Sequence, residues 1–157
     1  MDNKKILLVS STGGHYAQLK NLNSVISNHS NITSYILTEK RDTERNENKY
    51  YLVQQDRNQI QSFIYNTFKN ALITFKCLID IKPDVVISTG AGATLPALII
   101  GRLIGSKIIF IESFSKVHSL TLTGKIAYHI ANKFYVQWDS DELIRKYPKA
   151  IYKGKLY

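Results

Sequence analysis

The chain has 157 residues, of which 44% are hydrophobic and 21% are charged. These values predict one globular domain with a single hydrophobic core, and they exclude fibrous and wholly disordered chains. The single cysteine excludes a disulfide-stapled scaffold and favours a reducing compartment. With 21 basic and 12 acidic residues the net charge is +9, which is typical of proteins that meet nucleic acid, an anionic membrane or a phosphorylated ligand.

Strands and helices alternate through the first half of the chain. Residues 5–10 are a continuous apolar run, which predicts a buried parallel strand, and a glycine turn at 11–14 precedes a helix at 15–28. A strand at 32–38, a polar loop at 39–49 and a short strand at 50–53 follow. The longest helical pattern covers residues 59–81, and its apolar stripe contains Phe68, Phe75 and Leu78.

The second half repeats this alternation. The sequence predicts, in order, a strand at 84–88, a glycine loop at 89–94, a helix at 95–104, a strand at 107–112, a loop at 113–119, a helix at 122–132, a strand at 134–136 and a helix at 140–146. We therefore expect the α/β class, as a single Rossmann-like domain over residues 1–157 with a mostly parallel sheet. No apolar run is long enough to span a membrane, and the short one at 6–10 does not suit a signal peptide.

Three loops are expected at the edge of the sheet where ligands bind in this fold class, namely 11–15, 89–94 and 113–119. In the first two, glycine permits close backbone approach and the next helix directs N–H donors at the loop, which indicates phosphate or pyrophosphate binding. The competing interpretation is that these glycines serve only tight turns. Neither loop has the Walker or the dinucleotide pattern, so ATP hydrolysis and NAD binding are disfavoured and no cofactor is expected.

Two side chains near these loops are candidates for chemistry. His15 lies at a predicted helix start, where the helix dipole disfavours the protonated ring, so it suits a base or a hydrogen-bonding group; a structural role is the alternative. Glu112 ends a buried strand, where it either contacts a ligand or orders the next loop. No histidine and cysteine spacing matches a metal site, and no serine triad is visible, so no metal is expected.

Three ordered segments carry a family resemblance. They are Ser11-Thr12-Gly13-Gly14-His15 with Gln18, the run Pro83-Asp84-Val85-Val86-Ile87-Ser88-Thr89-Gly90-Ala91-Gly92, and Ile111-Glu112-Ser113. The chain thereby resembles bacterial capsular and exopolysaccharide glycosyltransferase subunits related to the membrane-anchor subunit of the eukaryotic two-subunit UDP-N-acetylglucosamine transferase. It is more distantly similar to the N-terminal half of the lipid II transferase MurG. The resemblance covers nearly the whole chain.

The resemblance implies the N-terminal half of a GT-B fold and a split enzyme. This half would bind a polyprenyl-pyrophosphate sugar acceptor, and a partner subunit would bind the UDP-sugar, with galactose from UDP-galactose as the expected hexose in capsular or exopolysaccharide synthesis. His15 becomes the candidate catalytic residue. The implied acceptor-binding residues are Ser11, Thr12, Gly13, Gly14, His15, Gln18, Thr89, Gly90, Ala91, Gly92, Glu112 and His118.

The eukaryotic subunit of this family starts with a transmembrane helix, whereas this chain starts at its first strand. We therefore expect a cytoplasmic protein attached peripherally to the inner face of the cell membrane. Lys69 and Lys76 on the 59–81 helix are the candidate membrane-surface residues, because no acidic residue lies between positions 57 and 79. The alternative is a core-packing helix whose lysines are simply solvated.

Two other function classes remain open from the sequence. A stand-alone nucleotide-sugar transferase is disfavoured by the lack of a second domain and of a clear acid–base pair. A nucleic-acid binder is suggested only by the net charge, since no helix-turn-helix, RNA-recognition or zinc motif is present. No nucleic-acid partner is expected.

Overall fold

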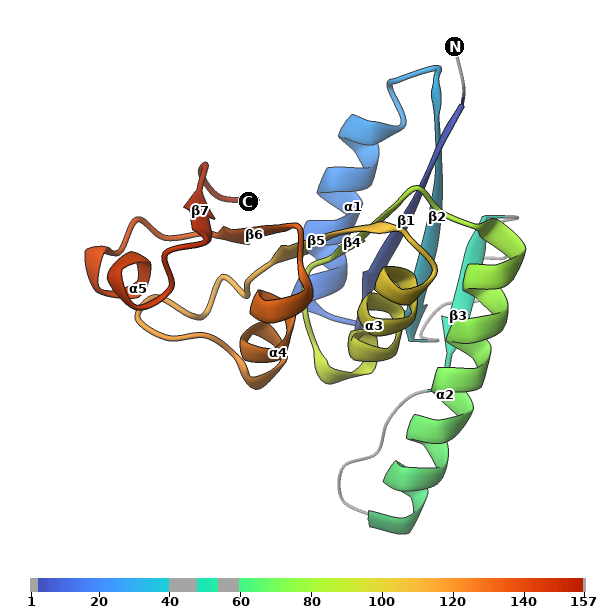
Figure 1. Ribbon diagram of the computed structural model, residues 1–157. Coiled ribbons are helices and arrows are strands. Elements are labelled where there is room, and N and C mark those ends of the chain that lie inside the picture. Colours follow the sequence, from blue (N-terminus) through green and yellow to red (C-terminus); the bar gives the residue numbers. More distant parts are fainter. Residues whose placement is uncertain (1–2, 40–47, 54–59, 157) are drawn as a thin grey trace.

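In the computed structural model the described residues are 3–39, 48–53 and 60–156, of which 60–64 are described by their backbone alone. They form a seven-stranded sheet in the order β3-β2-β1-β4-β5-β6-β7 (Figure 1). Every neighbouring pair is parallel. The strands are β1 Lys4–Ser10, β2 Ile32–Glu39, β3 Lys49–Leu52, β4 Val85–Ser88, β5 Lys107–Ile111, β6 Lys133–Val136 and β7 Ala150–Tyr152.

Helices connect the strands on both faces of the sheet. They are α1 Gly14–Ile26, α2 Ile60–Ile81, the 3₁₀ helix η1 Gly92–Thr94, α3 Leu95–Leu103, α4 Leu122–Ile130 and α5 Asp141–Lys146. The expected α/β class and single Rossmann-like domain are thus confirmed, with a sheet that is wholly parallel among the described strands. The boundaries differ from the predicted ones by at most two residues, and β7 was not predicted.

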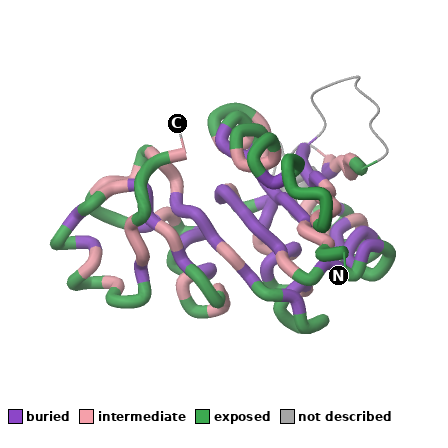
Figure 2. The backbone as a smooth tube through the Cα atoms, turned by 90° about the horizontal axis from the view of Figure 1, so that it is seen from above, coloured by how far each residue is buried: buried purple, intermediate pink, exposed green. Residues whose placement is uncertain are grey.

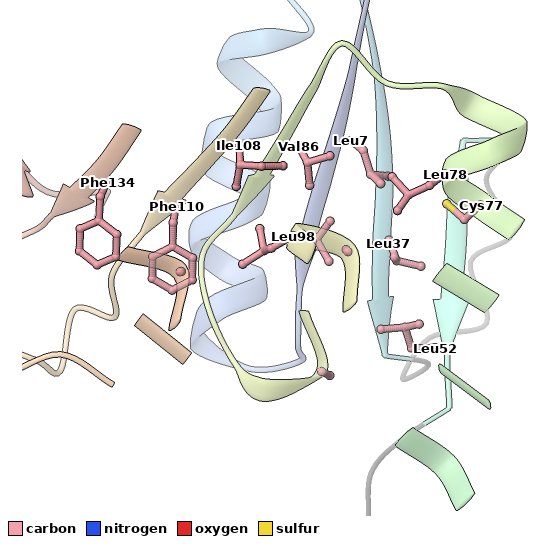
Figure 3. Close-up of a cluster of buried hydrophobic side chains, with 14 of the residues drawn as sticks. Leu7, Leu37, Leu52, Cys77, Leu78, Val86, Leu98, Ile108, Phe110 and Phe134 are labelled. Atoms are coloured by element: carbon pink, nitrogen blue, oxygen red, sulfur yellow. The ribbon is translucent and has the colours of Figure 1, made fainter. Parts of the chain in front are cut away.

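Side chains alternate between two hydrophobic clusters, as a buried parallel sheet requires. Leu7, Leu37 and Phe110 point toward the face covered by α2, α3 and α4 (Figure 3). The residues that follow Leu7 and precede Leu37, namely Leu8 and Ile36, point toward α1 on the other face. Figure 2 shows the resulting pattern, in which buried residues run through the strands and the outer surfaces of the helices are exposed.

The apolar stripe predicted for the 59–81 helix faces the core only in part in helix α2. Leu78 is buried, but Phe68 is 67% exposed and Phe75 is 52% exposed. The face turned to the sheet instead carries the polar residues Asn70 and Thr74 among the apolar ones. Asn70 is needed there because its side chain accepts from the backbone N–H of Val53 at 2.7 Å and donates to the Val53 carbonyl at 2.8 Å, just after β3.

Exposed apolar side chains gather on α2, α3 and α4. All the exposed large hydrophobic residues of the described chain except Val25 lie on these three helices or, in the case of Ile104, directly after α3. We call this set the apolar face: Tyr65, Phe68, Leu72, Phe75, Ile79, Ile99, Leu103, Ile104, Leu122 and Ile126. Lys69 and Lys76 are exposed beside it on α2. No helix among the described residues has the length and hydropathy needed to cross a bilayer.

Candidate functional site

The strand order places the two glycine loops side by side. Strand β1 pairs with β2 on one side and with β4 on the other, so the chain direction along the sheet reverses at β1 and β4. The loop at 11–14 follows β1, and the loop at 89–91 follows β4. Ligands of open α/β sheets bind at this switch point, outside the carboxyl ends of the strands. The expectation that both loops share one edge is therefore confirmed.

The backbone of both loops takes conformations that ordinary side chains disfavour. Gly13 has φ +81° and Gly90 has φ +111°. Ala91 has φ 77° and ψ 149°, a region that costs an L-residue about 1–3 kcal/mol and is concentrated at functional sites. The loop is held in place by Ser88, whose hydroxyl accepts from the Gly90 N–H at 3.1 Å and donates to the Thr94 hydroxyl at 3.0 Å.

His15 joins the two loops. Its Nδ1 lies 2.7 Å from the Thr89 carbonyl oxygen, and the Thr89 hydroxyl donates back to the His15 carbonyl at 2.9 Å. Because a carbonyl only accepts, Nδ1 carries the proton, and in the neutral ring Nε2 keeps a free lone pair. A Cβ at Gly90 would lie 3.1 Å from the ring carbon Cε1, so glycine at this position lets the imidazole pack against the second loop.

A groove of about 920 Å³ opens beside this histidine. Its lining comes from both glycine loops and from α2, α3 and α4: Ser11, His15, Thr67, Ala91, Gly92, Leu95, Pro96, Ile99, Ile100, Thr121, Leu122 and Thr123. The N-termini of α1 and of η1 with α3 meet at its loop end, and neither has an acidic residue in its first turn. Helix N-termini favour anions, so this end of the groove suits a phosphate group.

Glu112 is 1% exposed and does not line the groove. Its carboxylate accepts from the N–H of Ser113 at 2.7 Å, and from the N–H and the hydroxyl of Thr121 at 3.0 and 2.9 Å. Burial raises the pKa of Glu112, although the hydrogen bonds from Ser113 and Thr121 oppose the shift. Thr121 in turn caps α4 by accepting from the Gly124 N–H at 2.9 Å. These hydrogen bonds favour the second role considered for Glu112, which is to order the loop from Ser113 to Thr121.

Gln18 is also inside the protein, with 2% of its surface exposed. Its side chain donates to Gln137 at 3.3 Å, and Gln137 donates to the Glu112 carbonyl at 2.9 Å and accepts from the Leu156 N–H at 3.0 Å. This chain of hydrogen bonds ties α1 to the segment after β7. Gln18 therefore anchors α1 and does not line the groove.

The remaining predicted residues divide between the groove and its surroundings. His118 lies away from the groove, exposed and 3.6 Å from the Glu142 carboxylate. Thr12 and Gly13 border a smaller cavity of about 120 Å³ next to the ends of β2 and β3. Among the residues that the structure describes, no cluster of histidine, cysteine, aspartate or glutamate could hold a metal ion.

The sequence analysis missed the far wall of the groove, which Leu95, Pro96, Ile99 and Leu122 supply. They lie on two helices, where apolar residues normally indicate core packing, and the sequence carries no signal that α3 and α4 leave a gap. Thr121 was detectable, since a threonine before a helical pattern is a typical N-cap.

Comparison with known families identifies the family of this chain. The family model described as "Oligosaccharide biosynthesis protein Alg14 like" matches residues 6–156. The chain belongs to the Alg14-like family. Curated relatives include the "UDP-N-acetylglucosamine transferase subunit ALG14" of Mus musculus, which is 30% identical over 97% of this chain and 82% of its own length. The protein of the same name from Homo sapiens is 29% identical over 96% of this chain and 82% of its own length.

Solved structures show the fold of this Alg14-like chain to be half of a larger one. MurG of Acinetobacter baumannii matches with a TM-score of 0.70 at 14% identity, over 97% of this chain and 44% of that one. A UDP-GlcNAc 2-epimerase from Neisseria meningitidis matches with a TM-score of 0.73 at 17% identity, over 97% of this chain and 47% of that one. The Alg14-like chain thus spans less than half the length of these two proteins.

Two finer expectations have no support among the relatives. Their names specify UDP-N-acetylglucosamine, so they give no support to galactose or to a capsular or exopolysaccharide role.

Proposed function

We propose that this Alg14-like chain is the acceptor-binding, non-autonomous subunit of a two-subunit glycosyltransferase. The observation that carries the proposal is the convergence of two helix N-termini and His15 on one groove at the switch point of the sheet. The acceptor is a polyprenyl-pyrophosphate sugar, whose pyrophosphate lies against the backbone N–H groups of the loops at 11–15 and 89–92. No described lining residue is a lysine or an arginine, so the charge is met by helix dipoles and backbone donors.

The donor half is supplied by a partner subunit that faces the carboxyl edge of the sheet. Since the donor is then bound by the partner, residues of this chain do not select it. The names of the relatives make UDP-N-acetylglucosamine the first donor to test, and UDP-galactose the second.

In the assembled enzyme His15 acts as the general base. Its free Nε2 takes the proton of the acceptor hydroxyl while that oxygen forms a bond to the anomeric carbon of the donor sugar. The bond from the anomeric carbon to UDP breaks, and UDP leaves with the electron pair. Glu112 and Gln18 position the loops and do not contact the acceptor.

The pyrophosphate assignment is tested by Gly92→Val. A Cβ at Gly92 meets no atom within 4 Å and the residue has no positive φ, so a side chain can be attached at this lining position without a clash at its Cβ and without backbone strain. We expect the chain to keep its circular dichroism spectrum and its affinity for inorganic pyrophosphate to fall at least tenfold, on the order of 1.4 kcal/mol. Gly13→Val is a poorer test, because its φ of +81° would strain the backbone.

Ser24→Val is the matched control, since it adds the same side chain on an exposed position of α1 away from the groove. Titration calorimetry measures both variants. Unchanged pyrophosphate affinity in folded Gly92→Val would rule out the loop assignment.

We also propose that the apolar face is the membrane-facing surface, with Lys69 and Lys76 meeting anionic lipid headgroups. The support is the gathering of exposed apolar side chains on α2, α3 and α4, with two exposed lysines beside them. Each of the two interpretations of the 59–81 helix describes one side of α2. One face of α2 packs on the core, and the opposite face exposes apolar residues. Attachment of this kind makes the protein peripheral on the cytoplasmic face of the membrane.

The membrane assignment predicts weaker vesicle binding for a Lys69→Gln, Lys76→Gln variant. Each lysine near an anionic surface contributes about 1 kcal/mol, so partition onto vesicles with phosphatidylserine should fall by about thirtyfold in co-sedimentation. The control is Lys20→Gln with Lys153→Gln, an equal charge change outside the apolar face; both lysines are exposed, Lys20 on α1 and Lys153 after β7. If the Lys20, Lys153 control loses vesicle binding and the Lys69, Lys76 variant does not, the membrane contact lies on α1 or on the segment after β7 and not on the apolar face.

A further inference from the structure

The lining of the groove has a polar and an apolar half. Ser11, His15 and the backbone at Gly92 are polar groups at the glycine loops, and Thr67, Thr121 and Thr123 add hydroxyl groups from α2 and the start of α4. The apolar half consists of Leu95, Pro96, Ile99, Ile100 and Leu122 from α3 and α4, and it runs from the glycine loop along α3 to Ile100. A site of this kind fits an amphiphile whose charged group lies at the loops and whose apolar part lies along α3.

The apolar walls are not covered by the described part of this chain. Leu122 is 77% exposed and Ile99 is 44% exposed, although both border a groove that is already partly walled. An apolar ligand that covered them would remove this surface from water, which stabilises a complex in proportion to the area buried. Both residues also belong to the apolar face, so the groove opens directly onto the surface proposed to meet the membrane.

The size of the groove points the same way. At about 920 Å³ it lies at the upper end of the range for pockets that enclose a drug-sized molecule, roughly 300–1,000 Å³. A pyrophosphate group at the loop end fills only a small part of that volume. Helix α2 supplies Thr67 to the lining, and its first turns extend past the carboxyl edge of the sheet (Figure 1).

We infer that the apolar half of this groove is a binding site for the first prenyl units of the acceptor, a branched alkyl chain esterified to the pyrophosphate. The inference rests on the proposed function and adds a second subsite to it. The pyrophosphate lies at the glycine loops, and the attached chain runs between α3 and α4 and leaves the protein at the apolar face. The acceptor therefore reaches the catalytic histidine without its chain crossing water.

The test compares ligands with and without the chain, in the absence of lipid or detergent. Geranyl pyrophosphate, inorganic pyrophosphate and geraniol are titrated into the full chain by calorimetry. Each methylene group that is buried contributes about fourfold in affinity, so geranyl pyrophosphate should bind at least tenfold tighter than inorganic pyrophosphate. In amide NMR spectra geraniol should shift the signals of residues 95, 97–100 and 121–123.

A variant with Ile99→Ser and Leu122→Ser should lose most of that gain and bind inorganic pyrophosphate as wild type does. Both residues are exposed, so the fold is expected to persist, and the NMR shifts in the wild type test the site independently of the variant. Leu103→Ser is the control, because Leu103 is 79% exposed on α3 and does not line the groove.

Each result has one meaning. If pyrophosphate binds but geranyl pyrophosphate binds no tighter, the prenyl site is wrong and the pyrophosphate site stands. Binding of geranyl pyrophosphate and geraniol without binding of pyrophosphate supports the prenyl site and rejects the pyrophosphate site. No binding of any of the three rejects both. Equal loss in Leu103→Ser would mean that the chain adheres to the apolar face at large, which also overturns the prenyl site.

Discussion

Replacement of His15 by alanine is expected to lower kcat of the assembled transferase by about 10²- to 10⁴-fold, the usual contribution of a positioned general base. The ring has its Nδ1 proton committed to the Thr89 carbonyl at 2.7 Å, so its Nε2 lone pair is the group available to an acceptor hydroxyl. The substitution removes the base and its contact with the Thr89 carbonyl, but it leaves the helix N-termini and the bond from the Thr89 hydroxyl to the backbone carbonyl of residue 15, so the loops stay joined and KM for the acceptor should change by no more than a few fold.

The division between kcat and KM separates the catalytic role from a structural one. A histidine that only joined the two loops would, when removed, disturb the acceptor site and raise KM. His29→Ala serves as the control, since His29 is exposed in the turn after α1. Initial rates over a range of acceptor concentrations supply both constants. Unchanged kcat in His15→Ala would assign proton removal to another group.

The second large effect is expected for Gly124→Ala, which should destabilise the fold by about 3 kcal/mol. In an exposed helix this exchange normally stabilises, by up to about 1 kcal/mol. Here the new Cβ would overlap Oε2 of the buried Glu112 carboxylate. Overpacking costs typically about 1–3 kcal/mol, and a buried carboxylate pushed off its donors from Thr121 adds a similar penalty.

Urea unfolding followed by circular dichroism measures this effect. Gly92→Ala is the control, because a Cβ there meets no atom, and its stability should equal or exceed that of wild type. Adding Glu112→Ala to Gly124→Ala should cost less than the sum of the two single changes, since the overlap disappears. Wild-type stability in Gly124→Ala would show that Glu112 does not hold the start of α4.

Much of the fold was predictable because local patterns and tertiary structure agree. The continuous apolar runs of β1, β4 and β5 predict strands that are covered on both faces of the sheet. Strand β7 was missed because Ala150, Ile151 and Tyr152 are too few to show a pattern after Pro148, and it exists only by pairing with β6.

The orientation of α2 could not be predicted for a specific reason. Hydrophobicity placed Phe68 and Phe75 on one stripe, for which core packing and membrane contact both stayed open, whereas the buried face carries Asn70 and Thr74. Asn70 is buried there because it makes two hydrogen bonds to the Val53 backbone. The sequence of the helix does not indicate this tertiary contact. The apolar residues Phe68 and Phe75 on the outer face remain more than half exposed.

In the site, the glycine loops and His15 were predictable because a strand followed by glycine and a helix has one geometry. The roles of Gln18 and Glu112 were less so. Their positions in the sequence place both residues near the loops. Only the structure shows that Gln18 donates a hydrogen bond to Gln137 and that Glu112 accepts one from Thr121. His118 was included for its place in the third loop, and the structure pairs it with Glu142 instead.

The central claim is that this chain binds the acceptor and depends on a partner for the donor. The most direct measurement is sugar transfer from UDP-N-acetylglucosamine to a polyprenyl-pyrophosphate sugar by this chain alone, by a UDP-sugar-binding partner subunit alone, and by the two together. We predict background rates for each chain alone and an increase on the order of a hundredfold or more for the mixture, because a cleft between two domains is needed to bring both substrates together. Transfer by this chain alone at the rate of the mixture would contradict the claim.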